Sequence, residues 1–236
     1  MAQPCPHPIA GSKVSRMTPH FFGYGSLVNL STHDYPDARN ATLRGWRREW
    51  RHTDVRPFAF LSARPVSGAE IDGVIAAVPN ADWAALDERE AAYSRFDVSD
   101  AISAESKAAE IAVYQVDPFP RPKALAPILM SYLDVVIQGY MHRFGSVGVN
   151  AFFETTDGWD APILHDRAAP IYPRHQVLSA SDQDLVDRHM AQLPTVVKQL
   201  EQTRLTRERL LGWYSVLFGK NASGQHKRHA SKHHAP

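Results

Sequence analysis

The stretch His20-Phe21-Phe22-Gly23-Tyr24-Gly25-Ser26-Leu27 decides the start of the fold, because an apolar, aromatic run ends directly in a glycine loop. A short apolar run bounded by glycine is typical of a buried strand. The glycines let the backbone take a positive φ and let a ligand approach the loop amides closely. Such a loop serves either as a tight structural turn or as a cradle for a carboxylate or oxyanion. The stretch therefore predicts a strand over residues 20–24 and a candidate binding loop over residues 23–27.

Two familiar glycine motifs do not fit this loop. A dinucleotide-binding fingerprint needs a third glycine at position 28, which is Val28, and a helix directly after it. A serine-hydrolase elbow around Ser26 needs glycines at positions 24 and 28, which are Tyr24 and Val28. The loop therefore indicates neither a nucleotide site nor a serine nucleophile.

The rest of the chain divides into strand-like segments followed by helix-like ones. Residues 41–52 alternate so that Leu43, Arg47 and Glu49 fall on one side, and Gly45 indicates a bulge in that strand. Strands preceding helices, without an alternating βα rhythm, favour an α+β fold with a strongly curved sheet over a doubly wound parallel sheet. Further strands are predicted over residues 58–63, 70–79 and 110–116, and helices over residues 80–92 with Asn80 as N-cap, 125–143, 181–193 and 195–217.

Composition limits the classes of function. The 236 residues fit one large domain or one domain with an extension, and 44% hydrophobic residues suffice for a buried core. A net charge of +1 argues against broad phosphate neutralisation, so no nucleic-acid partner is expected. No stretch approaches the roughly 20 apolar residues that span a bilayer, so no membrane is expected. The single cysteine, Cys5, cannot form an internal disulfide, which fits a cytoplasmic location.

Four regions are expected along the chain. Residues 1–19 are predicted to be a flexible N-terminus, and residues 220–236 a disordered, histidine-rich tail. Between them, residues 20–145 are predicted to form the main domain and residues 146–219 a lid or helical extension. A solvated tail accounts for the terminal histidines, so no dedicated metal site is predicted.

Two acidic residues in the helix predicted over residues 80–92 fall on different faces of that helix. At about 100° per residue, Glu88 and Glu90 lie about 200° apart and cannot share a face. Glu90 falls with Leu86 and Tyr93 on the apolar face and is expected to point inward, whereas Glu88 is expected to meet solvent. An inward carboxylate either works as an acid/base group with a raised pKa or pairs with an arginine at a rim.

Three motifs follow one another along the chain in a recognisable order. Phe22-Gly23-Tyr24-Gly25-Ser26-Leu27, with the later Gly45-Trp46-Arg47-Arg48, comes first, followed by Arg89-Glu90 with Tyr93, and then by Ser131-Tyr132 with Gly139 seven residues after the tyrosine. Together they resemble the γ-glutamylcyclotransferase superfamily, and its ChaC-type, glutathione-specific branch most closely, across residues 20–140. The resemblance implies a curved mixed β-sheet or barrel, here with a C-terminal helical extension.

The resemblance also implies an activity. The family is a group of lyases that close the γ-glutamyl group of a small-molecule substrate on itself, releasing 5-oxoproline and an amine, as in glutathione metabolism. Glu90 would be the catalytic acid/base residue. Neither a cofactor nor a covalent enzyme nucleophile is implied. The residues implied to bind substrate are Tyr24, Gly25, Ser26, Leu27 and Tyr132.

Two features depart from the family pattern. Ala92 stands where a glycine often precedes the tyrosine, and this leaves the substrate open between γ-glutamyl peptides and γ-glutamyl amines. Residues 154–174 are rich in acids, aromatics and prolines and do not map onto the family domain. They are expected to form either a lid that selects the leaving group or a packed connection to the C-terminal helices. The alternatives to an enzyme are a ligand-binding or regulatory module on the same fold and a helical interaction protein built on residues 181–217.

Overall fold

A computed structural model describes residues 18–52, 57–103, 110–117 and 124–202, together with residues 208 and 212. The lead-in before residue 18 and the tail after residue 219 lie outside the described residues. The strands are β1 (His20–Gly23), β2 (Arg39–Arg51), β3 (Phe60–Ala77), β4 (Ser94–Asp97), β5 (Ile102–Ser103), β6 (Ile111–Gln115), β7 (Ile128–Leu129), β8 (Thr156–Asp157), β9 (Ile163–His165) and β10 (Val197–Gln199). The α-helices are α1 (Ala84–Arg89), α2 (Met130–Glu154) and α3 (Ala180–Met190).

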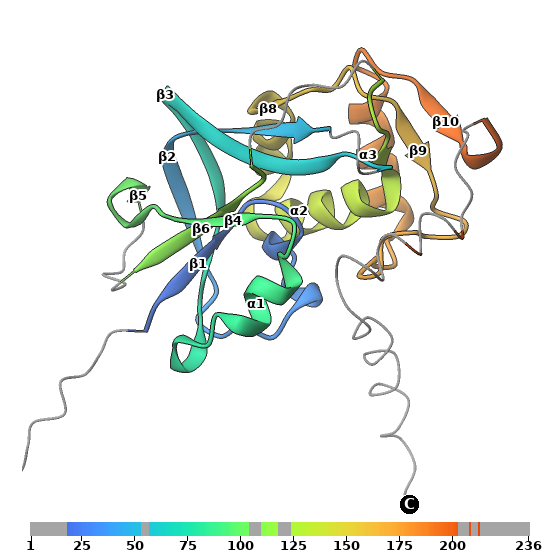
Figure 1. Cartoon of the computed structure of the whole chain (residues 1–236). Helices are drawn as coiled ribbons and strands as arrows, with labels where there is room; N and C mark the ends of the chain where they lie inside the picture. The colour runs from blue at the N-terminus through green and yellow to red at the C-terminus, as the bar shows by residue number, and fades with distance from the viewer. Residues whose placement is uncertain are drawn as a thin grey trace, which may run out of the picture.

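The larger of two sheets is mixed and strongly curved, and α2 lies against it (Figure 1). Its strand order is β4-β6-β1-β3-β2-β5, with β8 paired to β2. β1 is its centre, because it pairs antiparallel with β3 on one side and parallel with β6 on the other. The smaller sheet, β10-β9-β7, is parallel. The α+β class with a curved mixed sheet, predicted from the sequence, is confirmed, as are the strands predicted over residues 20–24 and 110–116.

β2 and β3 form the longest strand pair of the sheet. The sequence predicted separate strands over residues 58–63 and 70–79, but β3 runs without a break from Phe60 to Ala77. It pairs with β2 at both ends, from Arg39 opposite Ile75 to Arg51 opposite Phe60. The exposed residues in the middle of β3 hid its continuity, because they lack the apolar alternation that marks a half-buried strand.

Gly45 produces the bulge that the sequence predicted in β2. Its φ is 77°, and the register with β3 shifts at this residue. Between the pairs Arg44–Glu70 and Trp46–Pro65, β2 advances by two residues and β3 by five. This odd difference moves the later side chains of β2 to the opposite face. Leu43 before it and Arg48 and Trp50 after it are all buried. The expected grouping of Leu43 with Arg47 on one side is therefore wrong.

The first helix is shorter than predicted. α1 begins at Ala84, not at Asn80, and it ends at Arg89. Asn80 has a φ of 57° and lies in a preceding 3-10 turn, so it is not the N-cap. The carboxylate of Asp82 accepts a hydrogen bond from the N–H of Ala84 at 3.1 Å instead. The chain leaves the helix after Arg89 and enters β4.

The second helix begins later and ends later than the predicted range of residues 125–143. Residues 128–129 form β7 instead of helix, because they pair in parallel with β9. α2 then continues to Glu154, with a kink at Gly145, whose φ is 66°. This kink coincides with the expected boundary between the main domain and its extension.

The C-terminal region combines helix and strand. α3 confirms the helix predicted over residues 181–193. The helix predicted over residues 195–217 is wrong at Val197–Gln199, which form strand β10. Residues 208 and 212 are helical, as predicted, and most other residues of the later part lie outside the described ranges. Within the described ranges, no helix has the length and apolar character needed to cross a bilayer.

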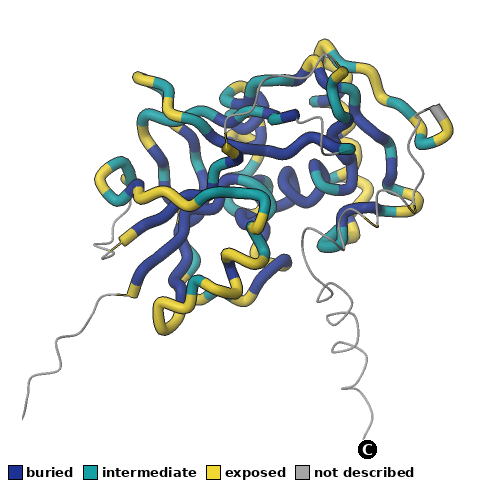
Figure 2. The backbone as a smooth tube through the Cα atoms, in the orientation of Figure 1, coloured by how far each residue is buried: buried dark blue, intermediate teal, exposed yellow. Residues whose placement is uncertain are grey.

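Two apolar clusters enclose β1 from opposite sides. Phe22 faces the main core between the sheet and α2, where Ile75, Val136 and Tyr140 are also at most 1% exposed. Phe21 faces a second cluster beneath α1, which includes Leu86. Figure 2 shows this buried centre, whereas much of α1 is exposed. Because both faces of β1 are covered, the loop that follows it starts from a fixed strand.

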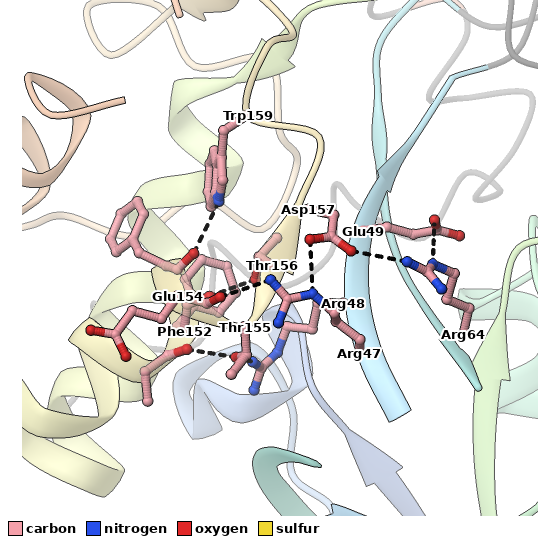
Figure 3. Close-up of polar contacts among 12 residues, drawn as sticks. Arg47, Arg48, Glu49, Arg64, Phe152, Glu154, Thr155, Thr156, Asp157 and Trp159 are labelled. Atoms are coloured by element: carbon pink, nitrogen blue, oxygen red, sulfur yellow. Dashed lines mark hydrogen bonds and ion pairs between the residues drawn. The ribbon is translucent and has the colours of Figure 1, made fainter. Parts of the chain in front are cut away.

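Arg48 connects β2 to the loop after β1. Its side chain is 1% exposed, and its guanidinium donates to the hydroxyls of Thr155 at 2.6 Å and Tyr140 at 2.5 Å and to the carbonyl of Asp72. The hydroxyl of Tyr140 lies 3.0 Å from the carbonyl oxygen of Tyr24. The neighbouring Arg47 points instead to Asp157 at the partly exposed edge of the sheet (Figure 3).

These two adjacent arginines are expected to differ sharply in their contribution to stability. Arg48→Ala leaves a cavity in the core and removes several buried hydrogen bonds, so it should lower the free energy of unfolding by about 3–5 kcal/mol. Arg47→Ala removes a half-exposed ion pair and should cost about 1 kcal/mol or less. Urea denaturation of both variants measures the difference. Equal losses would show that the buried network around Arg48 is not stabilising.

Candidate active site

A cavity opens where the loop after β1 faces the residues that follow α1. It has two adjoining halves: we call the half lined by the loop after β1 the inner half and the half lined by Tyr172 and Arg174 the outer half. They contain about 310 and 480 Å³ of space, part of which is open to solvent. The side chains shared by both halves are Ser26, Leu61, Glu90, Tyr93 and Tyr132. Every residue that the sequence predicted for the site lines this cavity, namely Tyr24, Gly25, Ser26, Leu27, Glu90 and Tyr132.

A glycine is needed at position 25 because a tyrosine side chain comes close to the backbone there, and not because φ is positive. Its φ is −115°, so the left-handed backbone that the sequence suggested is wrong here. A Cβ atom at this position would lie 2.6 Å from the hydroxyl oxygen of Tyr132. Tyr132 comes from α2, and its ring packs edge-to-face against Trp50 and Tyr172. The glycine therefore lets the loop and Tyr132 face each other across a narrow cavity.

The loop contains a short 3-10 turn over Ser26–Val28. The N–H of Val28 donates to the carbonyl of Gly25 at 3.0 Å, which is the first hydrogen bond of the turn. The N–H groups of Ser26 and Leu27 precede this bond and have no acceptor within the turn. Both residues line the inner half of the cavity. Amides in this position suit an oxyanion or a carboxylate, and the cradle role of the loop stays a prediction.

The far end of the loop is fixed to α2. The side-chain amide of the buried Asn29 donates to the carbonyl of Val135 at 3.0 Å and to the side chain of Gln138 at 2.9 Å. Gly139 allows this approach, since a Cβ atom there would lie 2.7 Å from the backbone nitrogen of Asn29. The loop is thus held between β1 and α2, and Gly139 of the third sequence motif contacts the loop of the first.

His33 also holds the loop in place through its imidazole ring. Its Nε2 lies 2.9 Å from the carbonyl oxygen of Leu27, and its Nδ1 accepts from the N–H of Tyr35 at 3.2 Å. These partners require a neutral ring with the proton on Nε2. Burial, with the nearby guanidinium of Arg89 adding to it, lowers the pKa of His33 to about 4.

The stability of the protein is therefore expected to fall as the pH is lowered from about 6.5 towards 4. In this window the unfolded chain binds a proton on His33 that the folded protein excludes, which removes up to about 3 kcal/mol. His33→Gln keeps a donor for the carbonyl of Leu27 but does not titrate. Urea midpoints measured across this pH window should fall less steeply for His33→Gln than for the unmodified protein. An equal fall of the urea midpoint with pH in both proteins would contradict the lowered pKa of His33.

Glu90 is the carboxylate of the cavity. It is the C-cap residue directly after α1, and its side chain is 14% exposed, whereas Glu88 is exposed. Burial raises the pKa of Glu90, and the positive charges of Arg89 and Arg174 oppose that rise. A carboxyl group with a raised pKa at the wall of a cavity is suited to proton transfer. The inward and outward directions of the two glutamates agree with the helical faces read from the sequence.

Arg89 connects Glu90 to the binding loop. Its Nε donates to Glu90 Oε1 at 3.2 Å, and its terminal nitrogens donate to the carbonyl and hydroxyl oxygens of Thr32 at 3.0 and 3.2 Å. The hydroxyl of Ser26 lies 3.5 Å away. One guanidinium thus fixes the carboxylate relative to residues 26–32. The sequence placed this arginine in a motif but did not reveal this bridging position.

The outer half of the cavity contains residues that sequence reasoning did not assign to the site. Tyr93 donates from its hydroxyl to the carbonyl of Leu61 at 3.1 Å, and Tyr172 and Arg174 form the wall beyond it. Both belong to the segment that the sequence left as a lid or a packed connection. The sequence signal for them was an aromatic residue and a cation on either side of Pro173. Among the described residues, no group of three or more His, Cys, Asp or Glu is placed to hold a metal ion.

Residues 21–132 match the family model described as γ-glutamyl cyclotransferase, AIG2-like. This match includes the loop after β1, Glu90 and Tyr132. The match covers 112 of the 236 residues, a little under half of the chain. The superfamily expected from the three sequence motifs is confirmed, and the ChaC-type branch stays a prediction. Tyr172 and Arg174 lie outside the family match, in the part of the chain that follows the domain.

Some solved structures are similar to the chain at low identity. One is a γ-glutamyl cyclotransferase with 14% identity and a TM-score of 0.47, covering 72% of this chain and 99% of its own. Another is an uncharacterized protein from Homo sapiens with 14% identity and a TM-score of 0.48, covering 73% and 99%. A glutathione-specific γ-glutamyl cyclotransferase from yeast has 14% identity and a TM-score of 0.34, covering 86% and 98%. No curated protein sequence matches the chain.

Proposed function

We propose that the protein is a γ-glutamylcyclotransferase that converts a small γ-glutamyl compound into 5-oxoproline and a free amine. The observation that carries this proposal is the position of Glu90. Within the part of the chain that matches the family model, one mostly buried carboxylate faces the glycine loop after β1 across a cavity that is partly open to solvent. The loop supplies amides, and the carboxylate supplies a site for a proton.

The reaction needs little beyond conformation and proton movement. The α-amino nitrogen of the γ-glutamyl group attacks its own γ-carbonyl carbon, and the bond from that carbon to the leaving nitrogen breaks. Because nucleophile and electrophile belong to one molecule, a site that holds the folded conformer gains much of the rate enhancement from proximity. No water molecule is consumed, and the atoms of the substrate are all found in the two products.

Glu90 is assigned the proton transfers. Its carboxylate takes a proton from the α-ammonium group as the ring closes, and it returns a proton to the departing nitrogen. The loop amides of Ser26 and Leu27 are assigned the role of stabilising the negative charge that develops on the γ-carbonyl oxygen of the substrate. Arg89 keeps the Glu90 carboxylate oriented, since it also binds Thr32 on the loop side.

A product assay tests the proposal. Purified protein is incubated with γ-glutamyl amino acids, glutathione and γ-glutamyl amines, and 5-oxoproline is quantified by mass spectrometry. Time-dependent 5-oxoproline from at least one class supports a cyclotransferase, and the preferred class separates peptide from amine substrates. Saturable binding of these compounds without any product would favour the ligand-binding module considered as the alternative.

A further inference from the structure

The segment Asp166–Arg174 is built as a fixed wall of the outer half of the cavity. The buried carboxylate of Asp166 accepts from the N–H of Ser131 at 2.8 Å, from its hydroxyl at 2.5 Å and from the N–H of Ile171 at 2.9 Å. The hydroxyl of Ser131 in turn accepts from the N–H of Tyr172 at 3.2 Å. These bonds attach the segment to the first turn of α2, directly beside Tyr132.

An ion-pair network fixes the same segment a second time. The guanidinium of Arg167 makes two hydrogen bonds with the mostly buried carboxylate of Asp134, at 2.7 and 2.8 Å, and a third with Asp187 at 2.8 Å. Paired, planar contacts of this kind set orientation as well as position. Tyr172 follows, and its ring centroid lies 5.0 Å from that of Tyr132 in an edge-to-face contact. The segment is therefore a preorganised part of the cavity.

Arg174 ends this wall with a positive charge that acts on Glu90 through space. Within the ranges that the structure describes, no hydrogen bond or ion pair involves its guanidinium, although the residue is half-buried and lines the outer half of the cavity. By contrast, the other arginine of this half, Arg89, is engaged with Glu90 and Thr32. Two guanidinium groups and one carboxylate therefore line this half, which favours an anionic ligand.

We propose that Arg174 binds a carboxylate carried by the leaving amine, so that the preferred substrates are γ-glutamyl amino acids and peptides and not γ-glutamyl amines that lack a carboxylate. The inference rests on the proposed function. If Glu90 and the loop amides hold the reacting atoms in the inner half, the leaving group extends past Tyr93 and Tyr132 into the outer half. Arg174 lies there, outside the family domain, and is thus a specificity-determining residue of this chain.

The test compares matched substrates that differ only in that carboxylate. Glutathione and γ-glutamylalanine are each assayed beside the analogue whose C-terminal carboxylate is replaced by a carboxamide. The unmodified protein should turn over each acid about 10-fold more efficiently than its amide, because a half-buried charge-assisted hydrogen bond is lost. Arg174→Gln should bring the two within about twofold, mainly by raising KM for the acid, and Arg174→Lys should lie between.

A control and the opposing outcomes complete the design. Arg188→Gln changes an exposed arginine on α3 and should leave the acid-to-amide ratio unchanged. An unchanged ratio in Arg174→Gln, or an equal loss on acid and amide, would overturn the inference; the equal loss would place Arg174 on the glutamyl carboxylate instead. Those outcomes leave the proposed function standing, whereas a complete lack of 5-oxoproline from all four compounds would remove both. Thermal melts confirm that each variant is folded.

Discussion

Replacing Glu90 with glutamine is expected to lower the rate of 5-oxoproline formation at least about 100-fold while the protein stays folded. Glutamine has nearly the same shape, and its side-chain oxygen can still accept from Arg89, but it cannot take a proton from the substrate ammonium. Initial rates with the best substrate of the panel measure the effect. Glu88→Gln is the matched control, because it changes the exposed glutamate two residues earlier and should leave the rate unchanged.

Stability and pH dependence separate a catalytic role of Glu90 from a structural one. Burial raises the pKa of Glu90, so ionising it in the folded protein becomes unfavourable as the pH rises above the ordinary glutamate value. Glu90→Gln removes that penalty, and its melting temperature at neutral pH should be equal or higher. For the unmodified protein, kcat/KM should rise with pH through the raised pKa. A Glu90→Gln protein with normal turnover, or a dead Glu88→Gln protein, would contradict the assignment.

Replacing Gly25 with valine is expected to lower turnover by about 100-fold or more. A Cβ atom at this residue would lie 2.6 Å from the hydroxyl of Tyr132 and 3.5 Å from the side chain of Leu61. Tyr132 is confined by Trp50 and Tyr172, so relief requires the loop or the ring to move into the cavity. Displacements of about 1 Å at a reacting centre are enough for an effect of this size.

A pair of smaller changes identifies the contact responsible. Gly25→Ala should impair turnover less than Gly25→Val, and adding Tyr132→Phe to Gly25→Ala should restore part of it, because the hydroxyl that meets the new Cβ is gone. Ser26→Ala should weaken turnover only modestly, since the loop amides remain. Normal activity in a folded Gly25→Val protein would contradict the close approach of loop and tyrosine. A dead Ser26→Ala protein that still binds substrate would point to the serine hydroxyl itself.

The sequence predicted which residues line the inner half of the cavity better than it predicted the elements that carry them. Glu90 was expected on the inner face of a helix through residue 92, but α1 ends at Arg89. The inward direction predicted for Glu90 agrees with the structure, because Leu86, one turn earlier, is fully buried and fixes which side of this turn faces inward. Similarly, Gly25 was expected in a binding loop because glycine can take a positive φ. The structure shows that a glycine is needed there because the side chain of Tyr132 comes close. Residue type and spacing were therefore enough to place Glu90 and Gly25 at the cavity. The contacts that explain these placements come from packing between distant segments.

The parts that could not be predicted depend on contacts between distant segments. β7 and β9 are only two and three residues long, and they exist because they pair with each other in parallel across more than thirty residues of chain. β10 adds to the same sheet, where the sequence indicated a helix. The wall that ends in Arg174 is fixed by Asp166 and Arg167, whose partners lie on α2. These partners cannot be identified from local sequence patterns, so Tyr172 and Arg174 were not predicted as residues of the site.

The isotopic composition of the product tests the central claim most directly. The protein is incubated with its preferred γ-glutamyl substrate in water enriched in oxygen-18, with Glu90→Gln in parallel. Intramolecular cyclisation predicts 5-oxoproline without the label and an equimolar amount of free amine, both strongly reduced in Glu90→Gln. Glutamate carrying oxygen-18 in its γ-carboxyl group would show that water is the nucleophile, and would contradict the account.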